Sequence, residues 1–194
     1  MNKTKEIFNI KKPVTVLCID ASTNSLAFSL FEKGKLVRYG KIRFVGTDSV
    51  YKAGDAGKKS ISFFKKISAD ALVLESVIYS TSPKTTVNLA LVQGAIVSAA
   101  QVAGIKIVKT VSPMSWQSHI DNRLLSAEEK DSIEKNNPGR SASWYKTKQR
   151  ETRKNKTINM VNKKYKINIS DDDVADAIGI GWYVSDRWNS IFNE

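Results

Sequence analysis

The first apolar run of the chain reads Val14-Thr-Val-Leu-Cys-Ile-Asp20, and it ends in a carboxylate. A second run, Ala71-Leu-Val-Leu-Glu75, ends in the same way. Short continuous apolar runs are typical of strands that are covered on both faces. An ionised carboxylate in an apolar setting costs several kcal/mol unless it is paired. We therefore expect two buried strands whose terminal carboxylates serve a bound partner.

The pattern around these runs predicts an α/β protein. Strands are expected at 14–20, about 25–32, about 35–44, 70–75 and 105–109, and helices at 49–67, at 85–103 and from Pro113. Gly34 supplies the positive φ of a tight turn between the second and third strands, which makes them a hairpin. This order implies a five-stranded mixed sheet, antiparallel over its first three strands, with helices on both faces.

The composition of the chain changes in its second half, from about residue 121. Residues 121–150 are polar and contain the turn cluster Asn136-Asn-Pro-Gly139, so they are interpreted as a loop or inserted excursion from a single domain spanning 1–194. A basic helix is expected at about 149–164. Ser170 is the predicted N-cap of a final helix over 171–189.

Composition narrows the class of partner. The 194 residues hold 31 Lys and Arg against 19 Asp and Glu, a net charge of +12, which favours nucleic acid or an anionic surface. No uninterrupted apolar run is long enough to span a membrane, and the N-terminal residues show no apolar signal core. The single Cys18 excludes an internal disulfide. These features predict a protein of the reducing cytoplasm, including a host cytoplasm if the protein is phage-encoded.

Two more acids belong with Asp20 and Glu75. Asp173 and Asp176 stand three residues apart in the final helix, so they share one helix face. Carboxylates without a Cys/His cluster are the ligands of Mg²⁺ or Mn²⁺. The alternative for the acids at 171–173 is a helix N-terminus favoured by the macrodipole. Since Mg²⁺ held by carboxylates usually handles phosphates, the set predicts phosphoryl-transfer chemistry.

The chain resembles the RuvC family of Holliday-junction resolvases, which have a ribonuclease H-like fold. Four motifs in order carry the resemblance: Ile19-Asp20-Ala-Ser-Thr23, Val73-Leu-Glu75, Asn88-Leu-Ala-Leu-Val-Gln-Gly94-Ala-Ile-Val97 and Asp173-Val-Ala-Asp176-Ala177. The spacing from Lys154 to Met160-Val161 is similar as well. The resemblance covers about residues 14–120 and 150–188.

The chain departs from the family pattern in three places. The aromatic residue expected three positions after Glu75 is Ile78, with Tyr79 next to it. A lysine expected in the helix after the fifth strand is replaced by Gln117. The 121–150 excursion is longer than in bacterial members, which suggests a phage-type or divergent branch.

The resemblance implies a crossover junction endodeoxyribonuclease that hydrolyses phosphodiesters in four-way or other branched DNA, leaving 5′-phosphate and 3′-hydroxyl ends. Asp20, Glu75, Asp173 and Asp176 would hold two Mg²⁺ (or Mn²⁺) ions per active site, about 3.5–4 Å apart, with Asp20 bridging them. Lys154 would assist at the scissile phosphate. The sequence leaves open whether Asp172 or Asp173 lies closer to the metal.

A basic stretch provides the expected DNA contacts. Between Arg140 and Lys166, ten basic residues face one acid, Glu151, a density that favours phosphate contact over a solvated helix face. The predicted DNA-binding residues are Tyr79 as a wedge, Lys84, Arg140, Trp144, Lys146, Lys148, Arg150, Arg153, Lys154 and Lys156. For Trp144, base stacking and packing of the loop on the body are equal alternatives. Ala90, Gly94 and Ser98 form a small-residue stripe that serves either intrachain packing or, as the resemblance implies, a homodimer.

Other functions stay open at this stage. A ribonuclease H-type hydrolase of RNA–DNA hybrids would use the same acids. A sugar-kinase or actin-type ATPase would need a second nucleotide-binding domain and a glycine-rich loop, and a non-catalytic junction-binding protein would leave the acids unexplained. A membrane-surface role fits only the charge, because no basic amphipathic helix with apolar anchors is evident.

Overall fold

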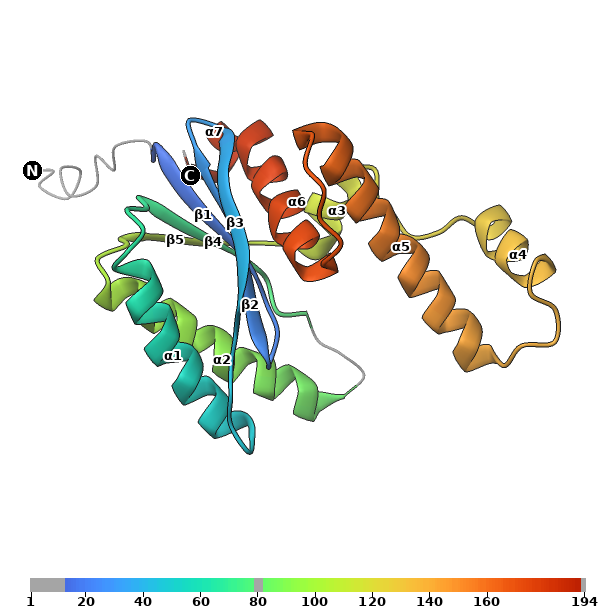
Figure 1. The fold of residues 1–194 in the computed structure, drawn as a ribbon, viewed down its shortest axis with the longest axis horizontal. Helices are drawn as coiled ribbons and strands as arrows, with labels where there is room; N and C mark the ends of the chain where they lie inside the picture. The colour runs from blue at the N-terminus through green and yellow to red at the C-terminus, as the bar shows by residue number, and fades with distance from the viewer. Residues whose placement is uncertain (1–12, 79–81, 193–194) are drawn as a thin grey trace, which may run out of the picture.

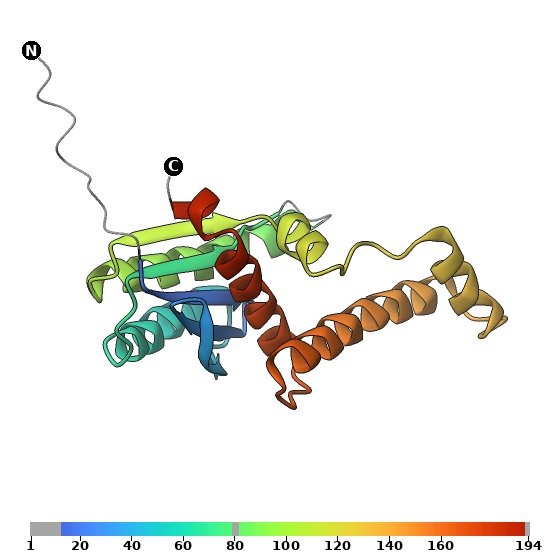
Figure 2. The same cartoon turned by 90° about the horizontal axis from the view of Figure 1, so that it is seen from above.

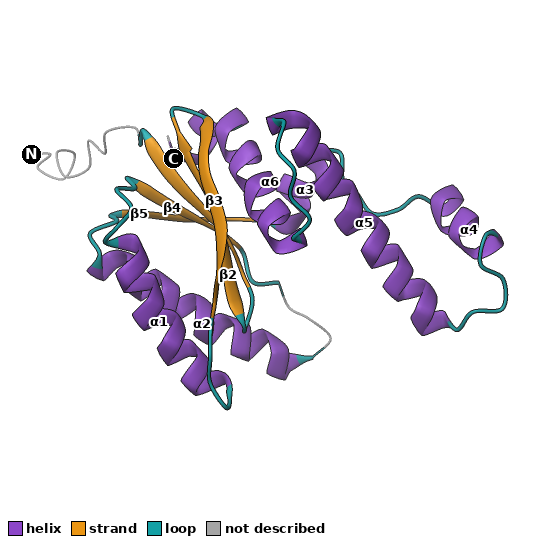
Figure 3. Ribbon diagram, in the orientation of Figure 1, coloured by secondary structure: helices purple, strands orange, loops and turns teal. Residues whose placement is uncertain are grey.

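The computed structural model describes residues 13–78 and 82–192. At its centre lies a sheet with the strand order β3-β2-β1-β4-β5 (Figure 1, Figure 3). The strands are β1 (Thr15–Ala21), β2 (Ser25–Glu32), β3 (Lys35–Arg43), β4 (Ala71–Glu75) and β5 (Ile107–Val111). β2 pairs antiparallel with β1 and β3, while β4 is parallel to β1 and β5. The predicted mixed sheet is confirmed.

Helices cover both faces of the sheet. The helices α1 (Ser49–Phe64) and α2 (Pro83–Val102) lie on one face, and α6 (Asp172–Asp186) crosses the other, with α3 (Pro113–His119) beside it (Figure 2). Leu17 and Ile19 of β1 pack into the α1/α2 layer, whereas Val16 and Cys18 pack into the α6 layer. All four side chains are fully buried. This explains why β1 is apolar without alternation.

The β2–β3 hairpin has the expected tight turn. Both Lys33 (φ 49°) and Gly34 (φ 76°) adopt positive φ. Two central residues with positive φ define a type I′ turn, whose twist matches that of the flanking strands. The register that follows places Lys41 of β3 opposite Ala27 of β2, and Ala27 opposite Asp20 of β1.

The segment 121–150 is largely helical, so of its two interpretations the loop was wrong, and the inserted excursion stays a prediction. It contains α4 (Ala127–Lys135) and the start of α5 (Ala142–Tyr165), so the basic helix expected from 149 begins at Ala142. Ser126 forms a capping box with Glu129 at the start of α4, and the Ser141 hydroxyl accepts a hydrogen bond from the Trp144 amide at the start of α5.

These two helices lack the apolar periodicity on which helix prediction depends. No described residue of α4 is buried, and α5 buries only Thr157 and Val161. The two helices project from the sheet at one side of the molecule (Figure 1, Figure 2). We call residues 126–152, which comprise α4, the following turn and the outer part of α5, the arm.

The boundaries of three other elements differ from the prediction. The N-cap of α6 is Asp171 rather than Ser170, because the Asp171 carboxylate accepts a hydrogen bond from the Val174 amide at 3.1 Å. The helix ends at Asp186, and a short α7 (Trp188–Phe192) follows. α1 ends at Phe64 rather than 67. β5 begins at Ile107 rather than 105, and Ile105 is a buried residue of the preceding loop.

The small-residue stripe of α2 faces outward. Ala90, Gly94 and Ser98 are exposed, and a side chain at Gly94 would meet open space. Leu91 and Val87 are 44% and 65% exposed on the same side. Packing within the chain therefore does not account for the stripe.

By length and composition, α2 is the one described helix that could cross a membrane. A single helix of this kind is weak evidence, because core helices of soluble proteins pass the same test. The expected absence of a membrane span stays a prediction.

Candidate active site

The first two acids lie at the same end of the sheet and on the same face. Residues two apart in a strand share a face, so Asp20 points with Cys18 toward the α6 layer and Glu75 points with Val73 toward it. The parallel register of β1 and β4 pairs Ile19 with Leu74. Asp20 and Glu75, which follow these paired residues, therefore stand side by side at the carboxyl ends of neighbouring strands.

The environment of Asp20 is strongly unfavourable to its charge. Burial raises the pKa of Asp20 well above its usual value, and the negative charges of Glu75, Asp176 and Asp173 raise it further. Lys154 opposes this effect only in part. Asp20 thus lies at the centre of four acids whose charges act on one another.

Glu75 is held by a buried tryptophan. Trp116 of α3, fully buried, donates its indole N–H to Glu75 Oε2 at 2.6 Å. Burial raises the pKa of Glu75, and this hydrogen bond lowers it in part. Trp116 fits only because α6 carries a glycine beneath it, since a Cβ at Gly179 would lie 2.8 Å from the indole ring. Gln93 of α2 donates to the Glu75 carbonyl at 2.9 Å, which completes the support of this residue.

The contacts of the first turn of α6 show which of its acids faces Asp20 and Glu75. Asp172 forms an ion pair with Lys154 of α5. The negative charge of Asp173 raises the pKa of Asp20. The ammonium of Lys41 in β3 forms an ion pair with Asp173 at 2.6 Å. Asp173 is therefore the acid nearer to the cluster, and Asp172 faces α5.

Lys41 joins the edge of the sheet to the start of α6. Its ammonium lies 3.0 Å from Asp171 Oδ2 as well as on Asp173. Lys41 occupies the same row across the sheet as Asp20, with Ala27 of β2 between them, so β3 supplies a cation to the acids at the start of α6. This contact helps to fix the helix start relative to the strands.

Asp176 is the acid most deeply placed on α6. Burial and the charge of Glu75 raise the pKa of Asp176 to about 7, while Lys154 and the hydroxyl of Thr157 oppose this rise in part. Both Lys154 and Thr157 belong to α5. The inner part of this helix therefore contributes directly to the site.

The donor set suits a hard divalent cation, although the side chains do not enclose one as they stand. The four acids offer only carboxylate oxygens, which Mg²⁺ and Mn²⁺ prefer. Burial is the largest cause of the raised pKa of Asp20, and the charges of Glu75, Asp176 and Asp173 add to it, so a bound cation would stabilise the charged form. Within 13–78 and 82–192, however, no three Asp, Glu, His or Cys side chains converge closely enough to hold an ion. The residues fit such a cation in chemistry and place, and their side chains would have to move to coordinate it.

The predicted DNA-binding residues fall into two groups. Lys146 and Arg150 are exposed on the arm, and Lys84 is exposed near the start of α2. Others have contacts within the chain: Lys148 pairs with Glu151 at 3.3 Å, Lys156 pairs with Glu129, and Arg153 donates to Gln117 Oε1 at 2.7 Å.

The aromatic candidates are only partly placed. Trp144 lies on α5 with the guanidinium of Arg140 5.4 Å from its ring centre, and its ring meets Tyr145 edge-on. The Tyr145 hydroxyl donates to the Asn137 carbonyl, so this pair closes the turn of the arm. Tyr79 lies outside the described residues.

Sequence reasoning missed four residues of this site. Lys41 and Trp116 contact the acids directly. Thr157 lowers the pKa of Asp176, and its hydroxyl accepts a hydrogen bond from Asn122. Trp116 alone carried a signal, because it stands next to Gln117 in the helix where the family pattern places a lysine. The other three come from elements whose distance from the acids depends on how the chain folds.

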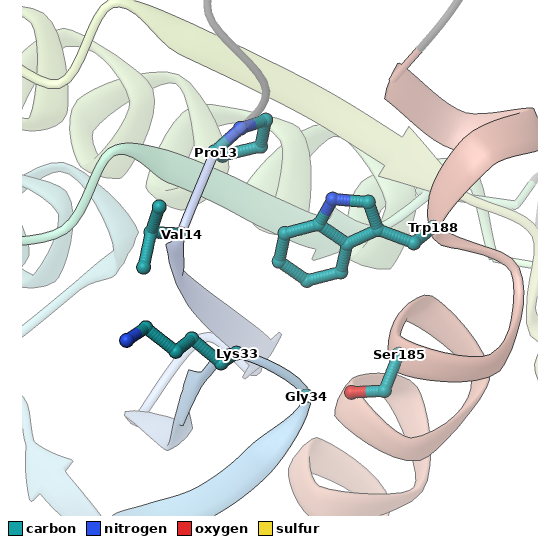
Figure 4. A pocket seen from close by; sticks show the side chains of 6 residues that line it. All are labelled: Pro13, Val14, Lys33, Gly34, Ser185 and Trp188. Atoms are coloured by element: carbon teal, nitrogen blue, oxygen red, sulfur yellow. The ribbon is translucent and has the colours of Figure 1, made fainter.

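A separate cavity lies at the opposite end of the sheet. It has a volume of about 380 Å³, and Figure 4 shows the residues that line it: Pro13, Val14, Lys33, Gly34, Ser185 and Trp188. The start of β1 and the end of α6 form its walls, whereas the acids lie at the end of β1 and the start of α6. The cavity is thus remote from the candidate site.

The strand order and the helices on both faces define a mixed α/β architecture with four acids at one end of the sheet. The chain matches no protein-family model and no curated protein. Solved structures resemble it: Thermus thermophilus RuvC in complex with a Holliday junction substrate has a TM-score of 0.63 at 14% identity, covering 91% of this chain and 94% of that chain.

A second Thermus thermophilus RuvC structure has a TM-score of 0.61 at 14% identity, covering 91% of this chain and 95% of that chain. The yeast mitochondrial Holliday junction resolvase Ydc2 has a TM-score of 0.48 at 15% identity, covering 96% and 82%. The chain has the ribonuclease H-like fold in the form found in RuvC.

Proposed function

We propose that this protein is a metal-dependent endonuclease that cuts branched DNA, four-way junctions included. The observation that carries the proposal is the gathering of Asp20, Glu75, Asp173 and Asp176 at one end of a RuvC-like sheet. Such a set of acids repels DNA and destabilises the fold unless it binds cations. A purely structural or DNA-binding role gives no reason for it.

The four acids would hold two Mg²⁺ ions, with Mn²⁺ as a substitute. Bound Mg²⁺ supplies a more acidic water as nucleophile and neutralises charge at the leaving 3′-oxygen. Trp116 keeps one oxygen of Glu75 oriented, and Lys41 keeps Asp173 against the sheet. The charge of Lys154 lowers the pKa values of both Asp20 and Asp176. Lys154 would therefore be placed to neutralise a phosphate bound beside these acids.

The arm supports a path for the DNA backbone. Lys146, Arg150 and Lys154 follow one another at four-residue intervals, so they lie along one face of α5. The outer two are exposed, and the third stands at the acids. A phosphate backbone lying along this face would be led to the candidate active site.

We further propose that the protein acts as a homodimer through α2. The exposed face of this helix is apolar, with Val87, Leu91 and the small residues Ala90 and Gly94. Small residues allow a second helix to approach closely. A two-fold dimer would present two active sites to the two strands of a four-way junction.

The test is cleavage of labelled four-way, Y-shaped and linear duplex DNA and of an RNA–DNA hybrid with Mg²⁺, by the wild type and by Asp20→Asn. Paired nicks in branched DNA, lost in Asp20→Asn and kept in the exposed control Asp131→Asn, are expected. The control removes the same charge from α4, away from the acids.

The other outcomes assign a different function. Cutting of the hybrid alone would replace the proposal with a ribonuclease H-type activity. Tight binding of branched DNA without cleavage in Mg²⁺ or Mn²⁺ would leave a binding protein. Single rather than paired nicks would contradict the dimer.

A further inference from the structure

Arg153 of α5 reaches across to α3 and is held there by a neutral side chain. Its Nη2 atom donates to Oε1 of Gln117 at 2.7 Å, and both residues are half-buried. The chain that leaves α3 supports the same point, because Asn122 donates to the Arg153 carbonyl at 3.0 Å. Both helices pack against α6 (Figure 1). We call the contact between Arg153 and Gln117 the clasp.

No described carboxylate neutralises the charge of Arg153. Three lysines of the same helix each have an acidic partner: Lys148 with Glu151, Lys154 with Asp172 and Lys156 with Glu129. Within 13–78 and 82–192, Arg153 forms no such ion pair. A guanidinium withdrawn from water is ordinarily paired with a carboxylate, because burial of an unpaired charge costs free energy. The positive charge of the clasp is therefore available to a ligand.

The guanidinium of Arg153 also has hydrogen-bond donors that the described part of the protein does not use. A guanidinium carries five N–H donors. Gln117 accepts from one of them, and the buried Nε has no partner among the described residues. Nη1 and the second N–H of Nη2 are left for an outside acceptor. Phosphate suits them, because its oxygens accept two parallel hydrogen bonds from one guanidinium.

The clasp lies beside the candidate active site. Gln117 is the residue after Trp116, which donates to Glu75. Arg153 is the residue before Lys154, which forms an ion pair at the start of α6. An anion held by the clasp would therefore lie next to the acids, at the point where the arm joins the body.

We propose that the clasp is a binding site for a phosphate of the DNA backbone beside the acids, with Arg153 as the binding residue and Gln117 as its positioning residue. This inference rests on the proposed function. Gln117 suits the task because its amide oxygen orients the guanidinium without cancelling its charge, as a carboxylate would. In the sequence Arg153 is one of ten basic residues, whereas its neutral partner sets it apart from the paired lysines of α5.

The test is binding of labelled four-way DNA by gel shift across a salt series, with thermal unfolding of each variant. EDTA in the buffer keeps the measurement independent of the proposed cations. Gln117→Glu replaces the amide by a carboxylate of the same shape, so Arg153 gains an ion-pair partner in place. We expect about 5-fold weaker binding near 0.1 M salt, and a slope of log K against log salt that is lower by about 1. The unfolding temperature should stay the same or rise, because a charge-assisted hydrogen bond replaces a neutral acceptor.

Two changes of Arg153 itself complete the series. Arg153→Gln removes the charge without adding an acid, and it should give the same losses of affinity and slope as Gln117→Glu. Arg153→Lys keeps the charge but not the planar fork, so the slope should stay while the affinity falls about 2-fold. Lys106→Gln is the control for net charge, since this exposed lysine precedes β5 at the end of the sheet away from Glu75. The control should change the slope little.

A purely structural clasp predicts a different result. If the clasp only joins α3 to α5, Gln117→Glu strengthens that bridge, and its DNA affinity and slope should match those of Lys106→Gln. That outcome would overturn the inference, and so would a weaker affinity of Gln117→Glu with an unchanged slope. If Gln117→Glu failed to fold, the slopes of Arg153→Gln and Arg153→Lys would decide in its place.

The same measurement separates this inference from the proposed function. An unchanged slope in the clasp variants leaves the proposed nuclease intact if the wild type binds and cuts branched DNA. A wild type that does not bind branched DNA would overturn the proposed function and this inference together.

Discussion

The sheet with its acids and the arm handle charge in opposite ways. At the sheet, burial and mutual repulsion raise the pKa values of Asp20, Glu75 and Asp176. On the arm, Glu129 lies exposed beside Lys156, and this contact together with the Ser126 amide lowers its pKa. The sheet thus holds acids whose charged forms are disfavoured by burial and by one another, whereas the arm pairs its charges at the surface.

The two regions are also stabilised by different interactions. The sheet is held by buried side chains such as Leu17, Leu72 and Ile96, which can offset the cost of crowded acids. The arm has almost no buried residues and depends on helix caps, ion pairs and a tyrosine hydrogen bond. A region with a large buried core, such as the sheet, can tolerate destabilising buried acids. A region held by surface contacts, such as the arm, is suited to binding a partner at its surface.

The largest expected effect is the pH dependence of the metal-free protein. The pKa of Asp176 is raised from 3.8 to about 7 in the folded state, so its contribution is fully present below about pH 4 and is lost as the pH rises through 7. A shift of about three units corresponds to about 4 kcal/mol. The free energy of unfolding in EDTA should therefore fall between pH 5 and pH 8, as measured by urea denaturation.

Divalent cations and the arm provide the controls for this measurement. If the proposed metal site is right, Mg²⁺ should reduce the fall at pH 8, because a cation that binds the charged carboxylates only in the folded state stabilises that state. Glu129 should behave in the opposite way, since its lowered pKa gives a contribution that is present above its ordinary value of 4.5 and is lost as the pH falls below that value. A stability that rises from pH 5 to pH 8 without metal would contradict the contrast between the two regions.

A second prediction concerns DNA binding by the arm. Lys146→Gln combined with Arg150→Gln should weaken the binding of four-way DNA about 10-fold near 0.1 M salt and reduce the slope of log K against log salt by about 2. The reason is the loss of two phosphate contacts. Gel-shift titrations across a salt series measure both quantities.

Lys65→Gln with Lys66→Gln is the matched control, since these exposed lysines follow α1, before β4 and far from Glu75 along that strand. The control removes the same charge from the body and should change the slope little. Equal effects of the two double variants would mean that net charge, rather than the arm, attracts the DNA.

The smallest expected effect tests whether the arm and the sheet unfold together. Ser126→Ala removes the cap of α4 and should cost about 1 kcal/mol. Because the arm hardly contributes to the core, the loss should appear as faster hydrogen exchange in α4 while global unfolding stays unchanged. Asp48→Ala removes the equivalent cap of α1, within the body, and should lower global stability by a similar amount. If Ser126→Ala lowered global stability as well, the arm would unfold together with the body.

Much of the fold could be predicted from local sequence. The runs ending in Asp20 and Glu75 were continuous and apolar, so they could be assigned as buried strands, and Lys33-Gly34 marked the hairpin that makes the first strands antiparallel. The arm could not be assigned in this way. Its helices are stabilised by caps and surface pairs, and prediction from apolar periodicity overlooks such helices.

The sequence by itself determined which residues carry the acidic chemistry and the order in which they occur, because the ends of buried strands and a shared helix face follow from spacing alone. Tertiary structure decided the rest: that Asp173 rather than Asp172 faces Asp20, and that Lys41 and Trp116 support the acids. These contacts join residues far apart in the chain. Their geometry depends on how α3, α5 and β3 pack against α6, and no local pattern encodes that packing.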